Sequence, residues 1–288
     1  MNDQSKISAV WVYWAGGAEG EELRFSMRSV SKHFIDLENV VLCGDVPEWF
    51  GGAAINSPRF DGAAAKATFG SGRWCKWIDS IVKLLRICAD PRVTDRFVWL
   101  YDDTIFLRPI TAAELAIPRA GGQLCANTTA PASGKWREVL RRTTEELQAA
   151  GLPSRNYSHH GPVVYSKSQL LQTIAKFLPV YKPRAIESLY LNHWTPEADA
   201  VRCGDWLQYT KRPRASWAPR RSAAIANFGS FTRSVERVLA NRFPTQCAVE
   251  LDHWAPRKPD AFLSSDSDTP EDTPAPSVIV PSPIPPAF

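Results

Sequence analysis

The chain has 288 residues, which is long enough to bury a sizeable core in one α/β domain, or in one large domain with an appendage. A formal net charge of +4 and a pI near 8.7 suit an anionic ligand, but this mild excess does not by itself indicate nucleic acid. Residues 1–6 are polar and no run approaches the roughly 18 apolar residues of a membrane span, so a signal peptide and a transmembrane segment are not expected and a cytoplasmic location is.

The cysteines also favour a reducing compartment such as the cytoplasm. The chain contains no CxxC pair, and most of its cysteines lie in apolar segments, which is typical of buried thiols in a reducing compartment. We therefore do not expect a zinc site. The six cysteines are Cys43, Cys75, Cys88, Cys125, Cys203 and Cys247.

The first part of the chain alternates apolar strands with amphipathic helices. An apolar strand is predicted over 7–14, and it ends at Ala15-Gly16-Gly17, where small residues would let a ligand approach the backbone. A helix over 21–34, a buried strand over 40–45 and a second helix over 74–88 follow. Alternation of this kind predicts mostly parallel strands, because each crossover helix must return over the sheet.

Both predicted helices carry cations away from their apolar faces. Arg24, Arg28 and Lys32 recur at helical spacing on the first, and the second shows Lys76 and Lys83. A solvated face is the usual explanation for such a stripe, and we expect it for Lys83. Apart from Lys32, these cations are also candidates to bind an anionic ligand, since arginine can contact two oxygens at once.

The most informative segment is the strand over 96–101, which runs into Asp102 and Asp103 and then resumes at Ile105. In open α/β sheets, ligands collect at the carboxyl ends of the strands. Two adjacent carboxylates there repel one another unless a cation or hydrogen bonds neutralise them, and Mg²⁺ or Mn²⁺ takes such oxygen ligands together with substrate phosphates. The alternative is that the aspartates only begin a turn.

The second part of the chain continues the same pattern. We expect a strand over 123–128, helices over 135–150 and 168–177, and a short apolar helix over 186–194. The segment 263–288 holds seven prolines among Ser, Asp, Glu and Thr, a composition that predicts a disordered tail.

Several segments carry a family resemblance. Glu21-Glu22-Leu23-Arg24-Phe25-Ser26-Met27-Arg28-Ser29-Val30 and Val40-Val41-Leu42-Cys43-Gly44-Asp45-Val46-Pro47-Glu48-Trp49 resemble the second conserved region of the Stealth proteins, which transfer sugar phosphates in capsule synthesis. The opening strand and the aspartate pair fall in the same order. More broadly, residues 7–110 are similar to the GT-A glycosyltransferase fold, in which an aspartate motif holds the metal on a nucleotide-sugar diphosphate.

The resemblance implies a GT-A-like, mostly parallel central sheet flanked by helices, in one domain over 1–262. Its nucleotide-sugar half would span about 7–128 and its acceptor half about 129–262. Two departures favour ordinary glycosyl transfer over sugar-phosphate transfer. Ala15-Gly16-Gly17 stands where Stealth proteins have an aspartate, and 68–73 stands where they have an Asn-Ser-His segment.

The resemblance also implies roles for individual residues. The donor diphosphate would be held through Mn²⁺ or Mg²⁺ by Asp102 and Asp103, with a third ligand from His160 or His193; His159 and His253 are further candidates. A structural turn before Gly161-Pro162 is the alternative for the histidine pair. The expected donor-binding residues are Tyr13, Ala15, Gly16, Arg24, Arg28, Lys76, Lys83 and Asp102.

An inverting enzyme also needs a base for the acceptor hydroxyl, and the catalytic residues would then be Asp103 with Glu187 or the competing Asp205. A first-turn glutamate favoured by the helix dipole is the other explanation for Glu187.

The acceptor side is marked by aromatic residues among cations. Five lysines and arginines fall within 211–221, and we expect Trp206, Tyr209, Trp217 and Arg214 to bind the acceptor. Such mixtures suit stacking on sugars, or binding a nucleic-acid backbone with an extruded base, and an exposed basic loop is the plain alternative.

Three hypotheses follow. The first is a metal-dependent glycosyltransferase that uses a nucleotide-sugar donor and a saccharide acceptor. The second uses the same donor with a hydroxymethylated DNA base, as phage-encoded enzymes do, in the host cytoplasm. The third is a carbohydrate- or nucleic-acid-binding domain without catalysis.

Overall fold

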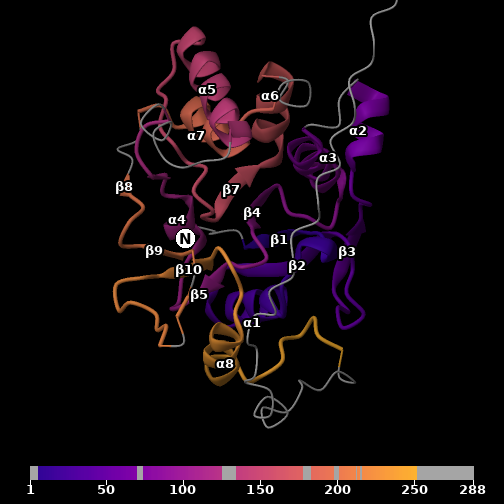
Figure 1. The fold of residues 1–288 in the computed structure, drawn as a ribbon, viewed down its shortest axis with the longest axis vertical. Helices are drawn as coiled ribbons and strands as arrows, with labels where there is room; N and C mark the ends of the chain where they lie inside the picture. The colour runs from indigo at the N-terminus through magenta and orange to yellow at the C-terminus, as the bar shows by residue number, and fades with distance from the viewer. Residues whose placement is uncertain are drawn as a thin grey trace, which may run out of the picture. The chain divides into compact units, whose positions relative to one another are not determined.

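The structure of the protein is a computed structural model that describes residues 6–69, 74–124, 134–177, 183–197, 201–211, 213–214 and 216–251. Its central sheet has five strands in the order β3-β2-β1-β4-β7 (Figure 1). All neighbours pair parallel except β7, which pairs antiparallel with β4 at one edge. The strands are β1 (Ile7–Tyr13), β2 (Leu37–Gly44), β3 (Ala53–Asn56), β4 (Arg96–Leu100) and β7 (Val163–Ser166).

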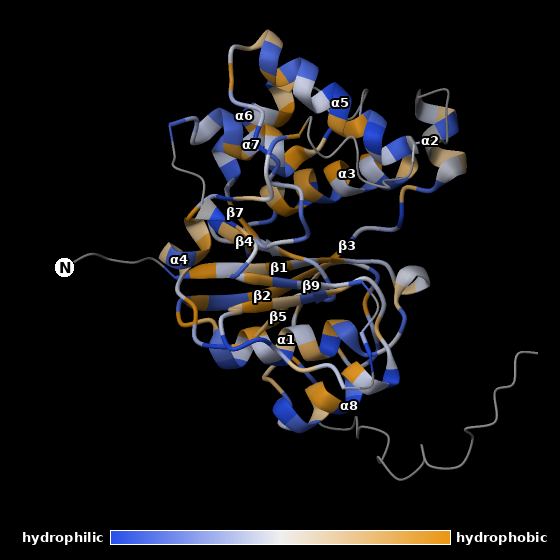
Figure 2. Cartoon of the chain, turned by 60° about the vertical axis from the view of Figure 1, so that its left-hand side comes forward, coloured by the Kyte–Doolittle hydropathy of each residue, from blue (hydrophilic) through white to orange (hydrophobic). Residues whose placement is uncertain are grey.

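Helices cover both faces of this sheet (Figure 2). On one side α1 (Glu22–His33) places Met27 in the same core cluster as Trp11 of β1, and on the other α3 (Cys75–Ala89) places Leu84 in the same cluster as Val10. α6 (Lys167–Phe177) and α7 (Ile186–Trp194) extend the second layer. Burial on both faces explains why β1 and β4 are apolar almost without interruption. The predicted fold class, a mostly parallel sheet flanked by helices, is therefore confirmed.

Two smaller sheets lie beside the central one. One joins β5 (Ile105–Phe106), β10 (Ile225–Phe228) and β9 (Leu207–Thr210), and the other joins β6 (Arg119–Ala120) and β8 (Val201–Arg202). The remaining helices are η1 (Ala15–Gly17), α2 (Gly62–Phe69), α4 (Ala112–Ala116), α5 (Gly134–Ala149) and α8 (Arg233–Arg242). Every described element belongs to the unit that spans Met1–Trp254. None of the described helices is long and apolar enough to cross a membrane.

Most predicted elements are found within two or three residues of their expected ends. The strand expected over 123–128 is not confirmed: Gln123 forms only an isolated bridge with Arg155, and residues 125–133 lie outside the described part. The expected tail over 263–288 also lies outside it. Five cysteines are described, all are free, and Cys43, Cys88 and Cys203 are buried as expected.

Candidate functional site

The carboxyl ends of β1, β2 and β4 meet at one edge of the central sheet. The chain leaves β1 toward β2 on one side, whereas β4 lies on the other, so the strand order reverses between β1 and β4. Ligands of open α/β sheets bind at such a reversal. Trp11 pairs with Leu100 in the parallel ladder, which brings Tyr13 and Asp102 to the same level two residues later.

Gly44 closes the end of β2 against β1. Its φ is +130°, and a Cβ added there would lie 2.0 Å from the carbonyl oxygen of Tyr13, so only glycine fits. The next residue, Asp45, accepts a hydrogen bond from the backbone N–H of Ala15 at 2.9 Å through its Oδ2. The predicted donor-binding residues Ala15 and Gly16 are exposed at this end of β1, close to Asp45.

Asp102 and Asp103 form a turn in which the backbone N–H of Thr104 donates to the carbonyl of Tyr101 at 3.1 Å. Asp103 is firmly held: its Oδ1 accepts from the side-chain amide of Asn227 at 3.1 Å and its Oδ2 from the backbone N–H of Phe228 at 2.9 Å. The aspartates therefore form a turn, and they lie at the carboxyl end of β4, where the metal-binding interpretation requires them; metal binding by the pair stays a prediction.

No described cation lies close enough to neutralise Asp102. Burial, with the negative charges of Asp103 and Glu22, raises the pKa of Asp102 to about 7. Burial also raises the pKa of Asp103, which the nearby imidazole of His160 opposes. Tyr13 belongs to the same group, since burial and the charges of Glu22 and Asp102 raise its pKa to about 12.

Glu22 is a carboxylate that the sequence predictions did not single out as part of the site. It lies in the first turn of α1 and is 4% exposed. Its Oε1 accepts from the backbone N–H of Glu19 at 2.6 Å, while its Oε2 is buried without a hydrogen-bond partner among the described residues. Burial raises the pKa of Glu22. The edge of the sheet therefore holds three neighbouring carboxylates.

His160 faces this acidic group and adopts a left-handed backbone conformation with φ +60°. Its ring stacks on Tyr101 at a centroid distance of 4.7 Å and tilts toward Tyr209 at 6.2 Å. His159 points elsewhere: its Nε2 lies 2.5 Å from the carbonyl oxygen of Arg119 and burial lowers its pKa. Only one of the two imidazoles therefore faces the aspartates, as expected, although His160 has a left-handed backbone and not the expected extended one.

Glu187 lies on the other side of Tyr101. It occupies the first turn of α7 and is buried, and it accepts hydrogen bonds from the hydroxyls of Tyr101 and Ser158, both at 2.8 Å. Burial and the charge of Glu187 hold the pKa of Tyr101 well above its usual range. Tyr101 therefore links the aspartate turn to Glu187.

A cleft of about 1210 Å³ opens beside these residues. Its wall includes Ser158, His160 and Tyr209 from the group just described, together with Asp205, which is exposed. The volume exceeds that of a typical small-molecule site, so the cleft has room for a ligand of several rings. The other lining residues are Ala120, Gly121, Gly122, Gln123, Trp136, Arg155, Asn156, His159, Arg202, Cys203, Gly204 and Leu207.

The donor set fits a hard divalent cation. Asp102 and Asp103 supply adjacent oxygen ligands, and burial with the charges of Asp103 and Glu22 raises the pKa of Asp102, a carboxylate that a bound cation would stabilise. Among the described residues no group of three His, Cys, Asp or Glu side chains could hold an ion alone. Mg²⁺ commonly uses only one or two carboxylates and completes its shell with water and substrate phosphates, so two ligands are compatible with such a site.

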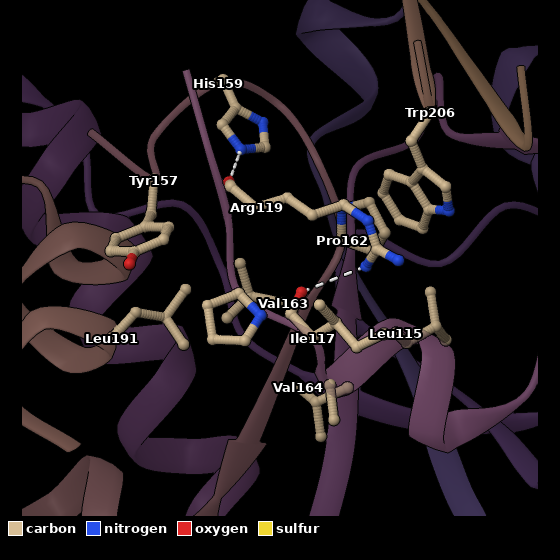
Figure 3. Close-up of a pocket in the computed structure, with 12 residues that line it drawn as sticks. Leu115, Ile117, Arg119, Tyr157, His159, Pro162, Val163, Val164, Leu191 and Trp206 are labelled. Atoms are coloured by element: carbon tan, nitrogen blue, oxygen red, sulfur yellow. Dashed lines mark hydrogen bonds between the residues drawn. The ribbon is translucent and has the colours of Figure 1, made fainter. Parts of the chain in front are cut away.

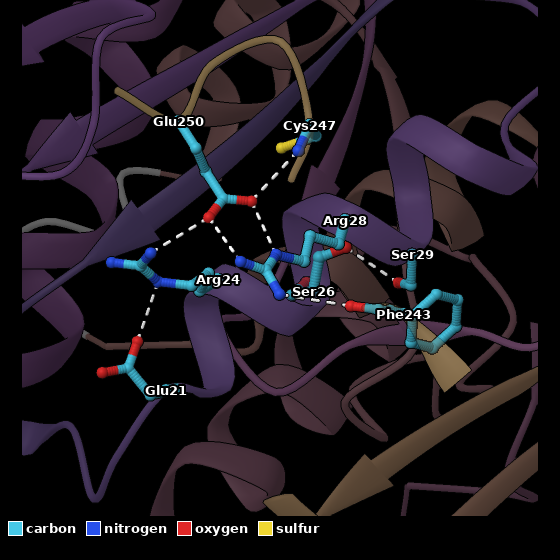
Figure 4. A network of polar contacts seen from close by, with 8 residues as sticks. All are labelled: Glu21, Arg24, Ser26, Arg28, Ser29, Phe243, Cys247 and Glu250. Atoms are coloured by element: carbon cyan, nitrogen blue, oxygen red, sulfur yellow. Dashed lines mark hydrogen bonds and ion pairs between the residues drawn. The ribbon is translucent and has the colours of Figure 1, made fainter. Parts of the chain in front are cut away.

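Arg24 and Arg28 are not on a solvated stripe, which corrects the expectation for this face of α1. Both are buried around Glu250, whose carboxylate accepts from Arg24 at 3.0 Å and from Arg28 at 2.6 and 2.7 Å (Figure 4). Arg24 also pairs with Glu21 at 2.9 Å. This network ties the segment before residue 251 to α1, and we leave the two arginines out of the donor site.

The two lysines of α3 have different surroundings. Lys83 is 1% exposed and pairs with Asp79 at 2.7 Å, so the expected solvated position for this residue is wrong. The ion pair gives Lys83 a local structural role in place of the expected contact with a diphosphate. Lys76 is exposed, and its binding role stays a prediction.

The structure does not bring His193 to the aspartates. His193 lies six residues beyond Glu187 on α7, a rise of about 9 Å along the helix axis, and its ring packs on Phe177 and Trp194 at 5.7 and 4.8 Å. His193 therefore belongs to the helical layer, which corrects its assignment as a metal ligand. The alternative histidine, His253, lies outside the described residues.

Two tryptophans expected at the acceptor site are also structural. The indole N–H of Trp206 donates to Glu114 at 2.9 Å, and the guanidinium of Arg119 covers its ring at 3.9 Å (Figure 3). The cavity beside them, about 20 Å³, has room for one water molecule. Trp217 is 9% exposed and packs on Phe228 at 4.9 Å, in the core under α8. Both assignments to the acceptor site are therefore corrected.

Tyr209 and Arg214 remain available to a ligand. Tyr209 is 51% exposed and lines the cleft, and Arg214 is exposed on the loop that follows β9. The residues missed by the sequence reasoning are Glu22, Tyr101, Ser158 and Asn227. A signal existed for Glu22, because it begins the helix after the first strand, and for Tyr101, because it directly precedes the aspartates.

No family model and no curated protein matches the chain. Similar solved structures include an active-site mutant of LgtC (12% identity, TM-score 0.46, 84% of this chain and 98% of that one). They also include the galactosyltransferase LgtC in complex with donor and acceptor sugar analogs (11% identity, TM-score 0.43, 84% of this chain and 98% of that one). A third is the apo-form glycosyltransferase GlyE of Streptococcus pneumoniae TIGR4 (10% identity, TM-score 0.34, 70% of this chain and 46% of that one). TM-scores below 0.5 at such identities support no conclusion about the function of this chain.

Proposed function

We propose that the protein is a metal-dependent glycosyltransferase that moves a sugar from a nucleotide-sugar donor to a hydroxyl acceptor. The observation that carries the proposal is the pair Asp102 and Asp103, which lies where the strand order reverses and in which no described cation neutralises Asp102. The large cleft beside the pair provides room for an acceptor. The sequence resemblance to GT-A enzymes agrees with this arrangement.

The donor diphosphate would be held at the aspartates with Mn²⁺ or Mg²⁺. A divalent cation bound there would act as a Lewis acid on the leaving diphosphate, where negative charge develops. Asp103 is oriented for this task by Asn227 and Phe228. The exposed backbone of Ala15 and Gly16 leaves space for the donor at the end of β1.

We assign the base to Glu187, acting through Ser158. Ser158 lines the cleft and its hydroxyl donates to Glu187 Oε2, so an acceptor hydroxyl that donates to Ser158 Oγ can lose its proton to the carboxylate. Asp205 lines the same cleft but is exposed and is the weaker candidate. Tyr101 holds the other carboxylate oxygen and fixes the orientation of Glu187.

Hydrolysis of a panel of nucleotide sugars with Mn²⁺ tests the proposal. We expect the wild type to hydrolyse at least one donor, and Asp103→Ala to lose turnover by at least a hundredfold while its circular dichroism spectrum is retained. Asp95→Asn, on an exposed carboxylate before β4, serves as the matched control and should retain turnover. If no donor is hydrolysed and no sugar is transferred by the wild type, a non-catalytic binding domain becomes the better explanation.

A further inference from the structure

Positive charge is concentrated in the last described part of the chain. Residues 206–251 contain eight lysines and arginines and only two acidic residues, although the whole chain has a net charge of +4. One of the two acids, Glu250, is buried against Arg24 and Arg28 and does not offset the surface charge. The segment therefore presents a strongly basic surface on an otherwise balanced protein.

Five cations of this segment are exposed and form no ion pair with a described carboxylate. Lys211, Arg214, Arg220, Arg221 and Arg237 are all exposed. No ion pair links any of these five side chains to a carboxylate within the described part of the chain. By contrast, the exposed Arg92, Arg108 and Arg141 elsewhere each have an acidic neighbour. Uncompensated charge of this kind is available to an anionic partner.

These cations are carried by elements that share one small core. Trp217 of the loop after β9 packs in the same cluster as Val235 and Leu239 of α8. Lys211 lies beside Ser230, whose hydroxyl donates to the Lys211 carbonyl at 3.4 Å, three residues before α8 begins. The loop and the helix are thus held together by one core, and we name their five exposed cations the basic surface (Lys211, Arg214, Arg220, Arg221 and Arg237).

The basic surface reaches the large cleft. Arg220 donates through one guanidinium nitrogen to the carbonyls of Gly204 and Leu207 at 2.9 and 3.2 Å, and both of these residues line the cleft. Tyr209, two residues before Lys211, presents a half-exposed ring in the cleft wall. A polyanion bound to the basic surface would therefore extend to the mouth of the cleft.

We propose that the basic surface binds the phosphate backbone of a nucleic acid. A membrane-binding surface would also expose apolar side chains for insertion, yet Tyr209 is the only exposed large apolar residue among those described in 201–251. Cations beside a single exposed aromatic ring match nucleic-acid surfaces, where lysine and arginine contact phosphates and a ring stacks on a base. This inference does not depend on the proposed transferase activity.

The test measures binding of a fluorescently labelled 20-base-pair duplex of unmodified DNA by anisotropy between 50 and 200 mM salt. We expect wild-type binding to weaken steeply with salt. The variant Lys211→Glu/Arg221→Glu/Arg237→Glu should bind at least tenfold more weakly at 100 mM salt, and its log–log salt slope should fall by about three, about one for each lost phosphate contact. The control Lys6→Glu/Lys66→Glu/Arg96→Glu makes the same charge change at exposed sites outside the basic surface, and should weaken binding less than about threefold.

Three results would overturn the proposal: no DNA binding by the wild type, equal losses in both triple variants, or binding to phosphatidylserine vesicles or to alginate at least as tight as binding to DNA. The last result would assign the surface to a membrane or to an anionic polysaccharide. Donor hydrolysis by the basic-surface variant is expected to match the wild type. Failure of nucleic-acid binding and failure of the transferase proposal are therefore separate observations.

Discussion

Replacing Asp102 by asparagine should make the protein more stable at alkaline pH, although it removes a residue of the proposed site. The pKa of Asp102 is raised to about 7 in the fold, whereas an unfolded aspartate titrates near 3.9. The stabilisation linked to protonated Asp102 is therefore fully present below about pH 4, and it is lost as the pH rises through about 7. Asparagine does not ionise, so this loss of stability at alkaline pH does not occur in the variant.

The stability difference between Asp102→Asn and the wild type can be calculated from the raised pKa of Asp102. About three pKa units correspond to about 4 kcal/mol at 1.36 kcal/mol per unit, and partial solvent access to the carboxylate reduces this to about 2 kcal/mol. The amide oxygen of the substituted side chain could still accept hydrogen bonds from the backbone N–H groups that Asp102 uses. We therefore expect Asp102→Asn to exceed the wild type by about 2 kcal/mol at pH 8.5, with the difference shrinking toward pH 5.

Urea denaturation at pH 5.0, 7.0 and 8.5 measures this difference. Asp95→Asn, an exposed position, should follow the wild type at every pH. Adding 1 mM Mn²⁺ at pH 8.5 should stabilise the wild type but not Asp102→Asn, because only the native carboxylate pair would bind the ion. Parallel pH profiles for the wild type and Asp102→Asn would refute the assignment of an uncompensated charge to this position.

Two further predictions concern stability. Glu250→Gln should lower the free energy of unfolding by about 3 to 5 kcal/mol, because it leaves Arg24 and Arg28 buried without their shared counter-ion. In urea denaturation Glu145→Gln, in an exposed pair, should cost less than about 1 kcal/mol, and equal losses would contradict the network. His160→Gly should be about 1 kcal/mol more stable than His160→Ala, because only glycine adopts φ +60° without strain. Thermal denaturation compares the two, and equal melting temperatures would argue against the left-handed conformation.

A third prediction concerns the proton relay. Glu187→Gln and Ser158→Ala should each lower kcat for transfer by about 10² or more with little change in the KM of the donor, because both residues act on the acceptor proton. Steady-state kinetics on the donor found by hydrolysis measures both constants. An unchanged kcat in both variants would remove Glu187 from the mechanism.

The first half of the fold could be predicted from the sequence because its signals are local. α1 and α3 show apolar residues at helical spacing, and β1 and β4 are apolar runs with polar residues only at their ends. The position of the aspartates followed from the same reasoning, since a residue after a central parallel strand must lie at the ligand-binding edge. The short strands β5, β9 and β10 carry too few residues to show a period.

The cations of α1 could not be placed from the sequence because their partner is remote. Arg28 and Glu250 are separated by 222 residues, and spacing along a helix does not show what packs against it. Trp217 was misplaced for a related reason. Its basic neighbours suggested a ligand surface, yet its ring fills the core beneath α8, a helix that the periodicity did not reveal.

The residues around the cleft also depend on contacts between segments that are remote in the sequence. Glu187 could be singled out as a candidate because it lies on a recognisable helix, but Ser158 and Tyr101 become its partners only when α7 packs beside β4 and the segment before β7. From the sequence, His160 of the 159–160 pair and His193 were both candidates for the third metal ligand. Only the fold separates the one that faces Asp103 from the one that packs on Phe177.

The central claim is that Asp102 and Asp103 bind a divalent cation together with a diphosphate. Isothermal titration of Mn²⁺ into the protein at pH 8, with and without inorganic pyrophosphate, tests it most directly. We predict one Mn²⁺ per chain with pyrophosphate present, and an affinity at least tenfold lower for Asp102→Asn and Asp103→Asn than for the wild type and Asp95→Asn. Equal Mn²⁺ affinity in all four proteins would contradict the claim.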